Sequence, residues 1–222
     1  MQRVFAILLL ALACAGASAC KADDHSFAAM ATEPASESGL LSKWKGAQRR
    51  MAEDEARLSD CRSEPWMCGD DELRLEAIVV AGRALHGRAR IGAINRAVNL
   101  AIRPASDERR FAVADHWSGP LETLGAGAGD CEDYAILKLL ALQQAGIAPE
   151  DLKLLIVQDR AARNDHAVAA VRLDGRWLIL DNRRFAMVDL EFTRYRILAQ
   201  LDPDAGGARY ASIRAAGSPD TM

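Results

Sequence analysis

The sequence Gly125-Ala126-Gly127-Ala128-Gly129-Asp130-Cys131-Glu132-Asp133-Tyr134 joins a glycine-rich run to the start of a predicted helix. Glycine loses more backbone freedom on folding than other residues, so alternating glycines indicate a special turn or a close approach by another group, such as a substrate backbone. The run delivers Cys131 to the first helical turn among three carboxylates. Taken alone, the stretch also fits a flexible loop before a helix with an inert, buried thiol.

The predicted helix runs from Cys131 to about Ala145, and Gly146 is a suitable C-terminal stop. Asp130 is a good N-cap, and Asp133 stands three residues further on, as in a capping box. The helix has a broad apolar face that comprises Ala135, Ile136, Leu139, Leu140 and Leu142. Because such a helix is normally buried, we expect the rest of the domain to pack around it.

Helices are also predicted before the glycine run, over residues 43–59, 71–85 and 91–102, from apolar residues at helical spacing. Asn95 and Asn99 are four residues apart and share a face of the third helix. Solvent exposure is the simpler explanation of these two asparagines. Polar contact with the site region is the alternative.

Beyond the central helix the hydrophobic pattern changes to a period of two, which is typical of strands. Strands are predicted over residues 152–158, 166–173 and 176–182, and residues 191–201 form a last helix or strand. Asp174-Gly175 is a strong signal for a two-residue hairpin turn. Helices followed by an antiparallel sheet indicate an α+β domain in which the central helix packs on the sheet.

The 222 residues suit one domain, and the composition, with 50% hydrophobic and 27% charged residues, is that of an ordinary globular protein. The net charge is −3 and no basic stripe is present, which argues against a nucleic-acid partner. We place the domain over residues 43–202, after a disordered N-terminus at 20–42 and before a loose tail at 203–222.

Residues 1–19 have the pattern of a secretory signal peptide. Arg3 precedes an apolar run over residues 4–13, and Ala17-Ser18-Ala19 is a suitable cleavage site. The apolar run is too short for a permanent membrane span, so we expect export into an oxidising compartment. Cys20 follows the cleavage site directly and is a candidate for lipidation, although position 17 carries alanine where a lipobox usually has leucine.

Cys14 lies in the predicted signal peptide, and the three cysteines after Cys20 divide into a pair and a single residue. Cys61 and Cys68 are close in sequence, and in an exported protein a local disulfide is favoured. A zinc pair is the alternative, but no second Cys/His pair at ligand spacing follows. Cys131 is left without an evident partner, and an unpaired thiol in an oxidising compartment calls for a functional reason.

The hairpin turn predicts which side chains of the two flanking strands meet. With Leu173 and Arg176 beside the turn, His166 faces Arg183, while Val168 faces Asp181. Because side chains alternate along a strand, His166 and Asp181 share a face and are diagonal neighbours. A carboxylate at the end of an apolar strand costs stability unless it is paired, which favours contact between these two residues.

Cys131, His166 and Asp181 therefore form a candidate catalytic triad on three neighbouring elements. A helix N-terminus lowers the pKa of a thiol, a histidine carries the proton, and an aspartate orients the imidazole. The backbone N–H of Cys131 is a candidate oxyanion donor. Each residue also has an ordinary explanation, as a buried thiol, a satisfied polar residue or a turn cap. His25, His86 and His116 are rival bases, and His116 is the strongest of them because it lies near the cysteine in sequence.

Asp130, Glu132 and Asp133 oppose thiolate formation, since like charges raise the pKa of a neighbouring thiol. A bound cation would cancel that effect, and carboxylate oxygens are ligands that suit calcium. The sequence therefore predicts a calcium site at these three residues. Helix capping by Asp130 and Asp133 with a solvated Glu132 is the alternative, and the two are compatible.

Five short motifs together resemble the bacterial transglutaminase-like cysteine proteinase family, over roughly residues 60–190. They are Asn95-x-x-x-Asn99, Asp115-x-Trp117-x-x-Pro120, Gly129-Asp130-Cys131-Glu132-Asp133-Tyr134-Ala135, His166-Ala167-Val168 and Leu180-Asp181-Asn182. The resemblance implies a papain-like fold, a triad of Cys131, His166 and Asp181, and calcium near Asp130, Glu132 and Asp133. It also implies periplasmic cleavage of a large cell-surface adhesin, under control of a membrane-bound cyclic-di-GMP receptor that sequesters the protease.

The chain departs from the adhesin-cleaving members in carrying the Cys61/Cys68 pair and a candidate lipid anchor at Cys20. We therefore expect an exported, calcium-dependent cysteine endopeptidase. The alternatives are an acyl-transfer enzyme of the same fold, such as a transglutaminase or amidase, and a non-catalytic calcium-binding interaction module.

Overall fold

The computed structural model describes residues 37–204 and 208–210. The predicted signal peptide at 1–19, the candidate lipidation site Cys20 and His25 lie outside these residues. Within the described part of the chain, no helix is both long enough and apolar enough to cross a membrane.

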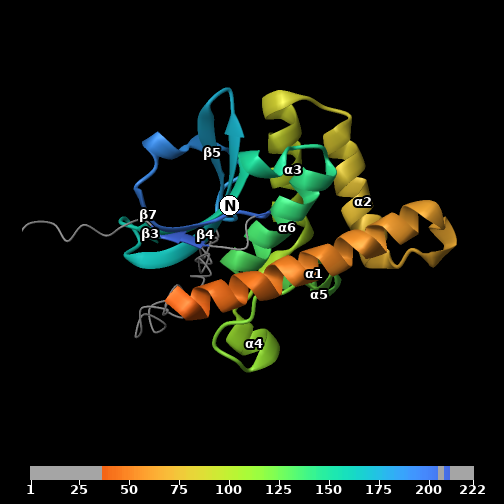
Figure 1. Cartoon of the computed structure of the whole chain (residues 1–222), viewed down its shortest axis with the longest axis horizontal. Coiled ribbons are helices and arrows are strands. Elements are labelled where there is room, and N and C mark those ends of the chain that lie inside the picture. Colours follow the sequence, from red (N-terminus) through yellow and green to blue (C-terminus); the bar gives the residue numbers. More distant parts are fainter. Residues whose placement is uncertain (1–36, 205–207, 211–222) are drawn as a thin grey trace, which may run out of the picture.

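The first half of the described chain is helical, as the sequence pattern predicts, and the helices gather on one side of the molecule (Figure 1). They are α1 Glu37–Ser63, α2 Asp70–Arg83, α3 Gly87–Ala101, α4 Asp107–Phe111, α5 Pro120–Ala126 and the central α6 Cys131–Gln144. Three short 3-10 helices, η1 Pro65–Met67, η2 Pro149–Asp151 and η3 Leu190–Phe192, lie in connections.

The second half forms a six-stranded antiparallel sheet in the spatial order β6-β5-β4-β3-β7-β8. A separate two-stranded parallel pair joins β1 to β2, immediately before α6. The strands are β1 Arg103–Pro104, β2 Ala128–Gly129, β3 Leu152–Asp159, β4 Asn164–Leu173, β5 Arg176–Leu180, β6 Val188–Asp189, β7 Tyr195–Leu201 and β8 Ala208–Tyr210. The α+β class and the antiparallel sheet are thus confirmed.

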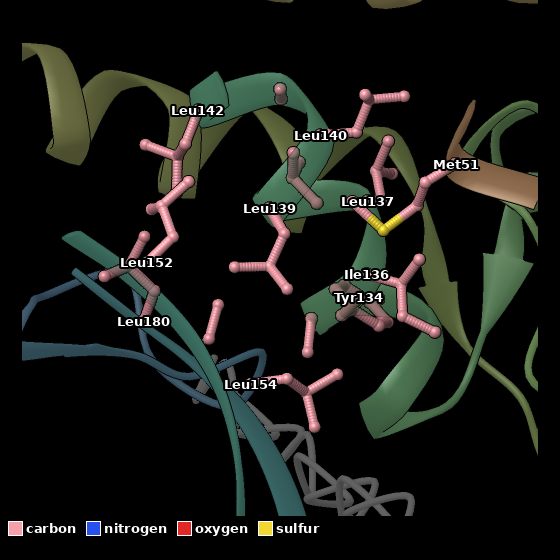
Figure 2. Close-up of a cluster of buried hydrophobic side chains, with 14 of the residues drawn as sticks. Met51, Tyr134, Ile136, Leu137, Leu139, Leu140, Leu142, Leu152, Leu154 and Leu180 are labelled. Carbon is pink, nitrogen blue, oxygen red and sulfur yellow. The ribbon is translucent and has the colours of Figure 1, made fainter. Parts of the chain in front are cut away.

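Helix α6 lies between the sheet and the other helices (Figure 1). Figure 2 shows its leucines between Met51 of α1 and Leu152, Leu154 and Leu180 of the sheet. The side chains of α6 from Tyr134 to Leu142 are buried, so the helix is apolar on nearly all sides. A helix of this kind is stable only inside a core, which explains why the chain folds around it.

The predicted hairpin register is confirmed where the strands pair: Arg172 lies opposite Trp177, and Ala170 lies opposite Ile179. The predicted pairing fails one step further, because β5 ends at Leu180 and the ladder stops there. Asp181 leaves the sheet, since its carboxylate accepts a hydrogen bond from the backbone N–H of Arg183 at 2.9 Å.

Two boundaries differ from the prediction. Helix α1 begins at Glu37, so residues 37–42 are helical rather than disordered. Leu40 is buried in this first part of the helix. Trp44 is buried just after it, and its indole N–H donates to the Asp202 carbonyl at 3.3 Å. Within the predicted loose tail, residues 208–210 form β8, which pairs with β7.

The cysteine pair is confirmed as a disulfide: Cys61 and Cys68 are bonded, with their Cα atoms 4.8 Å apart. The bond ties the end of α1 to the segment that leads into α2. Among the described residues, Cys131 is the free cysteine.

Candidate active site

The glycine run holds Cys131 at the start of α6 through backbone pairing. The Arg103 N–H donates to the Gly127 carbonyl at 3.1 Å, and the Ala105 N–H donates to the Gly129 carbonyl at 2.9 Å. The run is therefore ordered structure and not a flexible loop. It brings the thiol to a fixed place at the N-terminus of the central helix.

The glycines admit neighbouring acidic side chains rather than leaving room for a substrate. A Cβ at Gly125 would lie 2.6 Å from Asp71 Oδ2, and one at Gly129 would lie 2.7 Å from the Asp133 Cβ. Gly127 has a φ of +57°, a conformation that side chains other than glycine rarely adopt. Close packing and backbone conformation thus account for the three glycines that the sequence pattern singled out.

His166 and Asp181 form a buried pair, with His166 Nε2 3.0 Å from Asp181 Oδ1. Each residue is only 2% exposed. Asp181 Oδ1 also accepts the Arg183 N–H, and Asp181 Oδ2 accepts the Tyr195 hydroxyl at 2.5 Å. The structure therefore brings together two members of the predicted triad.

Burial acts in opposite directions on the two partners. For Asp181 burial favours the neutral acid, but hydrogen bonds from His166, Tyr195 and the Arg183 N–H outweigh it and hold the pKa below its usual range. For His166 burial lowers the pKa, and the Asp181 carboxylate offsets only part of that effect. The pair is thus an aspartate with a neutral imidazole at neutral pH.

Cys131, at the start of α6, lies beside strand β4. The backbone N–H of Ala167, the residue after His166, is close enough to the sulfur to favour its thiolate. The His166 Nδ1 atom is buried without a hydrogen-bond partner. The thiol itself donates to Glu132 Oε2 at 3.0 Å, and among the described residues no hydrogen bond joins Cys131 to His166.

The acidic neighbours oppose ionisation of the thiol, as the sequence predicts. Burial raises the pKa of Cys131, and the charges of Glu132 and Asp130 raise it further. Burial and neighbouring carboxylates also raise the pKa values of Asp130 and Glu132. Several acids crowded into one partly buried place repel one another, and this cost points to a compensating positive charge.

Asp107, Asp130 and Glu132 form an acidic cluster, in which one carboxylate oxygen from each residue lies within 4.8 Å of the others. The Oδ1 atoms of Asp107 and Asp130 are buried and have no hydrogen-bond partner. Oxygen atoms of this kind are suitable ligands for a hard cation, so the cluster could bind a metal. Asp130 stands at the N-cap of α6 but makes no side-chain cap bond, because its carboxylate belongs to this cluster.

Asp107 was missed by sequence reasoning, and Asp133 has a different role from the predicted one. Asp107 sits at the start of α4, in a stretch for which the sequence predicted no metal ligand, and it is 1% exposed. Asp133 lies outside the acidic cluster, since Arg110 Nη1 contacts its Oδ2 at 2.5 Å and the Ser118 N–H donates to its Oδ1 at 2.8 Å. Its carboxylate ties α4 and the following loop to α6.

The rival bases are placed elsewhere. The ring of His116 packs on Phe111, with ring centroids 4.4 Å apart, and its Nε2 lies 3.5 Å from Glu122 Oε1. The backbone N–H of His116 donates to Asp107. His86 is exposed at the N-cap of α3. Among the histidines of the described residues, His166 is therefore the one on the strand that runs past the Cys131 thiol.

Asn95 and Asn99 contact the site region, so solvent exposure, the simpler explanation, is wrong. The Asn99 Nδ2 group donates to the Asp181 and Arg184 carbonyls, both at 2.9 Å. Asn95 is fully buried and donates to the Phe185 carbonyl at 3.1 Å. Helix α3 thus holds the backbone on which Asp181 is carried.

Comparison with known proteins agrees with this arrangement. A sequence model of the family described as bacterial transglutaminase-like cysteine proteinase matches residues 57–215. A search of curated proteins found no match.

Solved structures of LapG from Legionella pneumophila are similar to this chain. One is 21% identical with a TM-score of 0.57, over 71% of this chain and 87% of that chain. An EGTA-treated form is 20% identical with a TM-score of 0.58, over 71% and 85%. A calcium-bound form is 21% identical with a TM-score of 0.46, over 65% and 91%. The TM-scores of 0.57 and 0.58 show a shared fold for the first two of these structures.

The family match covers well over half of the chain and includes Cys131, His166 and Asp181. The fold agrees with it, because a cysteine-bearing helix packed on an antiparallel sheet is the papain-like, transglutaminase-like arrangement that the resemblance implied. The chain belongs to the bacterial transglutaminase-like cysteine proteinases.

Proposed function

We propose that this protein is an exported, calcium-dependent cysteine endopeptidase that uses Cys131, His166 and Asp181. The observation that carries the proposal is the buried His166–Asp181 pair, whose free Nδ1 atom lies on the strand that runs past the Cys131 thiol. Membership of a cysteine proteinase family supports it.

The two ring nitrogens of His166 have different roles in this proposal. Nε2 carries its proton toward Asp181, which leaves the Nδ1 lone pair to take the proton from Cys131. The thiolate attacks the scissile carbonyl carbon, with the Cys131 N–H as a donor to the oxyanion. His166 then returns the proton to the leaving amine as the C–N bond breaks. Water hydrolyses the thioester, which releases the acid and restores the thiol.

The donor set of the acidic cluster suits a calcium ion. Asp107, Asp130 and Glu132 offer carboxylate oxygens close to one another, two of them buried and unpartnered. A bound calcium ion would supply positive charge beside the thiol. Glu132 acting as a ligand is a poorer acceptor for the thiol proton, so we expect ligation by Glu132 to favour transfer of that proton to His166. LapG, which shares this fold, has been solved in calcium-bound and EGTA-treated forms.

The substrate and the location are proposed from the family resemblance. We infer that the protein acts in the periplasm on a cell-surface or periplasmic protein, such as a large adhesin. A membrane-bound cyclic-di-GMP receptor is the proposed regulator, and Cys20 is a candidate lipid anchor. The mature protein would then act on other exported proteins near the membrane.

A comparison of surface proteins tests the function. Cells with wild-type protein should lose or shorten at least one surface protein that cells with Cys131→Ala or His166→Ala retain. His86→Ala is the matched control, because His86 is exposed at the N-cap of α3 and its side chain contacts Arg90. This variant should behave as wild type. Full biological effect from Cys131→Ala would refute the proposal.

An amine donor separates hydrolysis from acyl transfer, which the same triad could perform. The purified enzyme is incubated with surface proteins and a labelled primary amine. Cleavage without label in the remaining protein supports the peptidase. Incorporation of the amine without net cleavage would support a transglutaminase instead.

A further inference from the structure

Tyr195 is joined to both His166 and Asp181, yet neither the triad nor the acidic cluster accounts for it. Its hydroxyl donates to Asp181 Oδ2 at 2.5 Å. Its ring lies edge-on to the His166 ring, with centroids 6.1 Å apart and an interplanar angle of 63°. A single side chain thus contacts two of the three proposed catalytic residues.

The fold brings Tyr195 to this place through strand pairing. Tyr195 begins β7 and lies opposite Asp159, the last residue of β3. On the other side of β3, Val157 lies opposite His166 of β4. Three strands therefore converge where Asp181 leaves the sheet, and the position is fixed by backbone pairing rather than by a loop.

The hydroxyl completes the hydrogen bonding of a buried carboxylate. Asp181 Oδ1 is used by His166 Nε2 and the Arg183 N–H, so Oδ2 needs a donor of its own. A buried carboxylate with one unsatisfied oxygen pays a desolvation penalty, and its side chain is free to turn. The Tyr195 hydroxyl removes that freedom and keeps Oδ1 directed at the imidazole.

Other charged groups near the carboxylate do not duplicate this contact. Arg184 Nε lies 3.9 Å from Asp181 Oδ2, which is beyond hydrogen-bond distance, and Arg183 Nη1 contacts Asp159 Oδ2 at 3.3 Å. Lys138 donates to the Leu180 carbonyl at 3.1 Å. Within the described residues, the Tyr195 hydroxyl is the hydrogen-bond donor that reaches Oδ2.

We propose that Tyr195 is a positioning residue for the reaction: its hydroxyl orients the Asp181 carboxylate, and its ring holds the His166 imidazole from the side. The expected fall in kcat rests on the proposed function, whereas the effect on the His166–Asp181 hydrogen bond does not. Tyr195 contacts both His166 and Asp181, so it orients the hydrogen bond between them whatever the substrate is.

Tyr195→Phe is the direct test, because it removes the hydroxyl and keeps the ring. We expect kcat to fall about tenfold, with KM changed less than about twofold, since an orienting contact acts on the chemical step. We also expect the downfield proton resonance of the His166–Asp181 hydrogen bond to shift or broaden. His166→Ala identifies that resonance.

Tyr134→Phe is the matched control. Tyr134 is buried, and its hydroxyl donates to the Ile102 carbonyl at 2.7 Å, so this variant also loses one tyrosine hydrogen bond. A purely structural role for Tyr195 predicts that both variants lower the melting temperature and that neither moves the His166 resonance. Such a result, together with wild-type kcat for Tyr195→Phe, would overturn the inference.

The outcomes also distinguish a failure of the Tyr195 inference from a failure of the proposed peptidase function. If wild type and Cys131→Ala both fail to cleave any protein, the proposed function fails, and the resonance alone decides the role of Tyr195. If Tyr195→Phe does not fold, 3-fluorotyrosine at position 195 keeps the hydroxyl but makes it more acidic. The resonance must then shift, and an unchanged resonance overturns the inference.

Discussion

Asp107 and Asp133 are both buried carboxylates near Cys131, and their partners separate their roles. Arg110 and a backbone N–H engage both oxygens of Asp133, whereas Asp107 keeps one buried oxygen free beside Asp130 and Glu132. Sequence alone favoured Asp133, because it is only two residues from the cysteine. The partner from α4 could not be predicted, since only the folded chain shows which distant acid completes the cluster.

Asp107→Asn should weaken calcium binding. The variant keeps the size of the side chain and loses one negative charge, so the calcium concentration needed for half-maximal cleavage should rise at least about tenfold, while excess calcium restores activity. Calorimetric titration with calcium measures the affinity independently of cleavage.

Glu108→Gln is the control for this prediction, because Glu108 is the adjacent acid on α4 and is exposed. It should bind calcium as wild type does. Equal calcium affinity for Asp107→Asn and Glu108→Gln would exclude Asp107 as a ligand.

At the scale of elements, α6 carries both Cys131, the proposed nucleophile, and an unusual buried lysine. Lys138 is fully buried two turns after Cys131, and its ammonium lies 5.8 Å from the Tyr134 ring centroid. Burial lowers the pKa of Lys138 to about 7, although the Asp181 carboxylate acts against it. The hydrophobic pattern of the helix predicts burial of this face, but it does not predict that a lysine lies in it.

Lys138→Met should raise the free energy of unfolding, and the increase should be larger at low pH than at high pH. A folded-state pKa below the unfolded value means that the cost of burying the ammonium is complete below about pH 7. This cost diminishes as the pH rises toward 10.5, the ordinary pKa of lysine in the unfolded chain. From one pKa unit per 1.36 kcal/mol and the lost hydrogen bond, we expect a gain of roughly 4 kcal/mol at pH 6.

Thermal or urea unfolding at pH 6 and pH 9 measures this effect. The advantage of Lys138→Met over wild type should be clearly smaller at pH 9. Leu139→Met, a neighbouring core substitution without a charge, controls for the methionine and should show the same small effect at both pH values. A loss of stability in Lys138→Met that is equal at the two pH values would contradict the account.

At the scale of the whole molecule, the order of elements and the hairpin register could be predicted, because both depend on local patterns. The period of the apolar residues changes after Gly146, and Asp174-Gly175 sets the β4–β5 pairing. The ends of the domain could not be predicted, since they depend on distant contacts. At the N-terminal end, the Trp44 indole N–H donates to the Asp202 carbonyl. At the C-terminal end, β8 forms by pairing with β7.

The disulfide affects the stability of the whole molecule, because it joins the end of α1 to the segment that leads into α2. Replacing Cys61 and Cys68 together by serine should lower stability by about 2–3 kcal/mol, as expected for a short closed loop. The melting temperature should fall by roughly 5–10 °C. Calorimetry measures the change, and cleavage per folded molecule should remain that of wild type, because the bond lies outside the site. Loss of cleavage in the folded variant would show that the disulfide shapes the site.

The most direct test of the central claim uses purified protein and surface proteins taken from cells that carry Cys131→Ala. Wild-type protein with calcium is added, and newly formed protein N-termini are labelled and identified by mass spectrometry. We predict one or a few new N-termini with the wild-type protein, and none with Cys131→Ala, with His166→Ala or after chelation of calcium. The same new N-termini with Cys131→Ala would contradict the claim that Cys131 is the nucleophile of a peptidase.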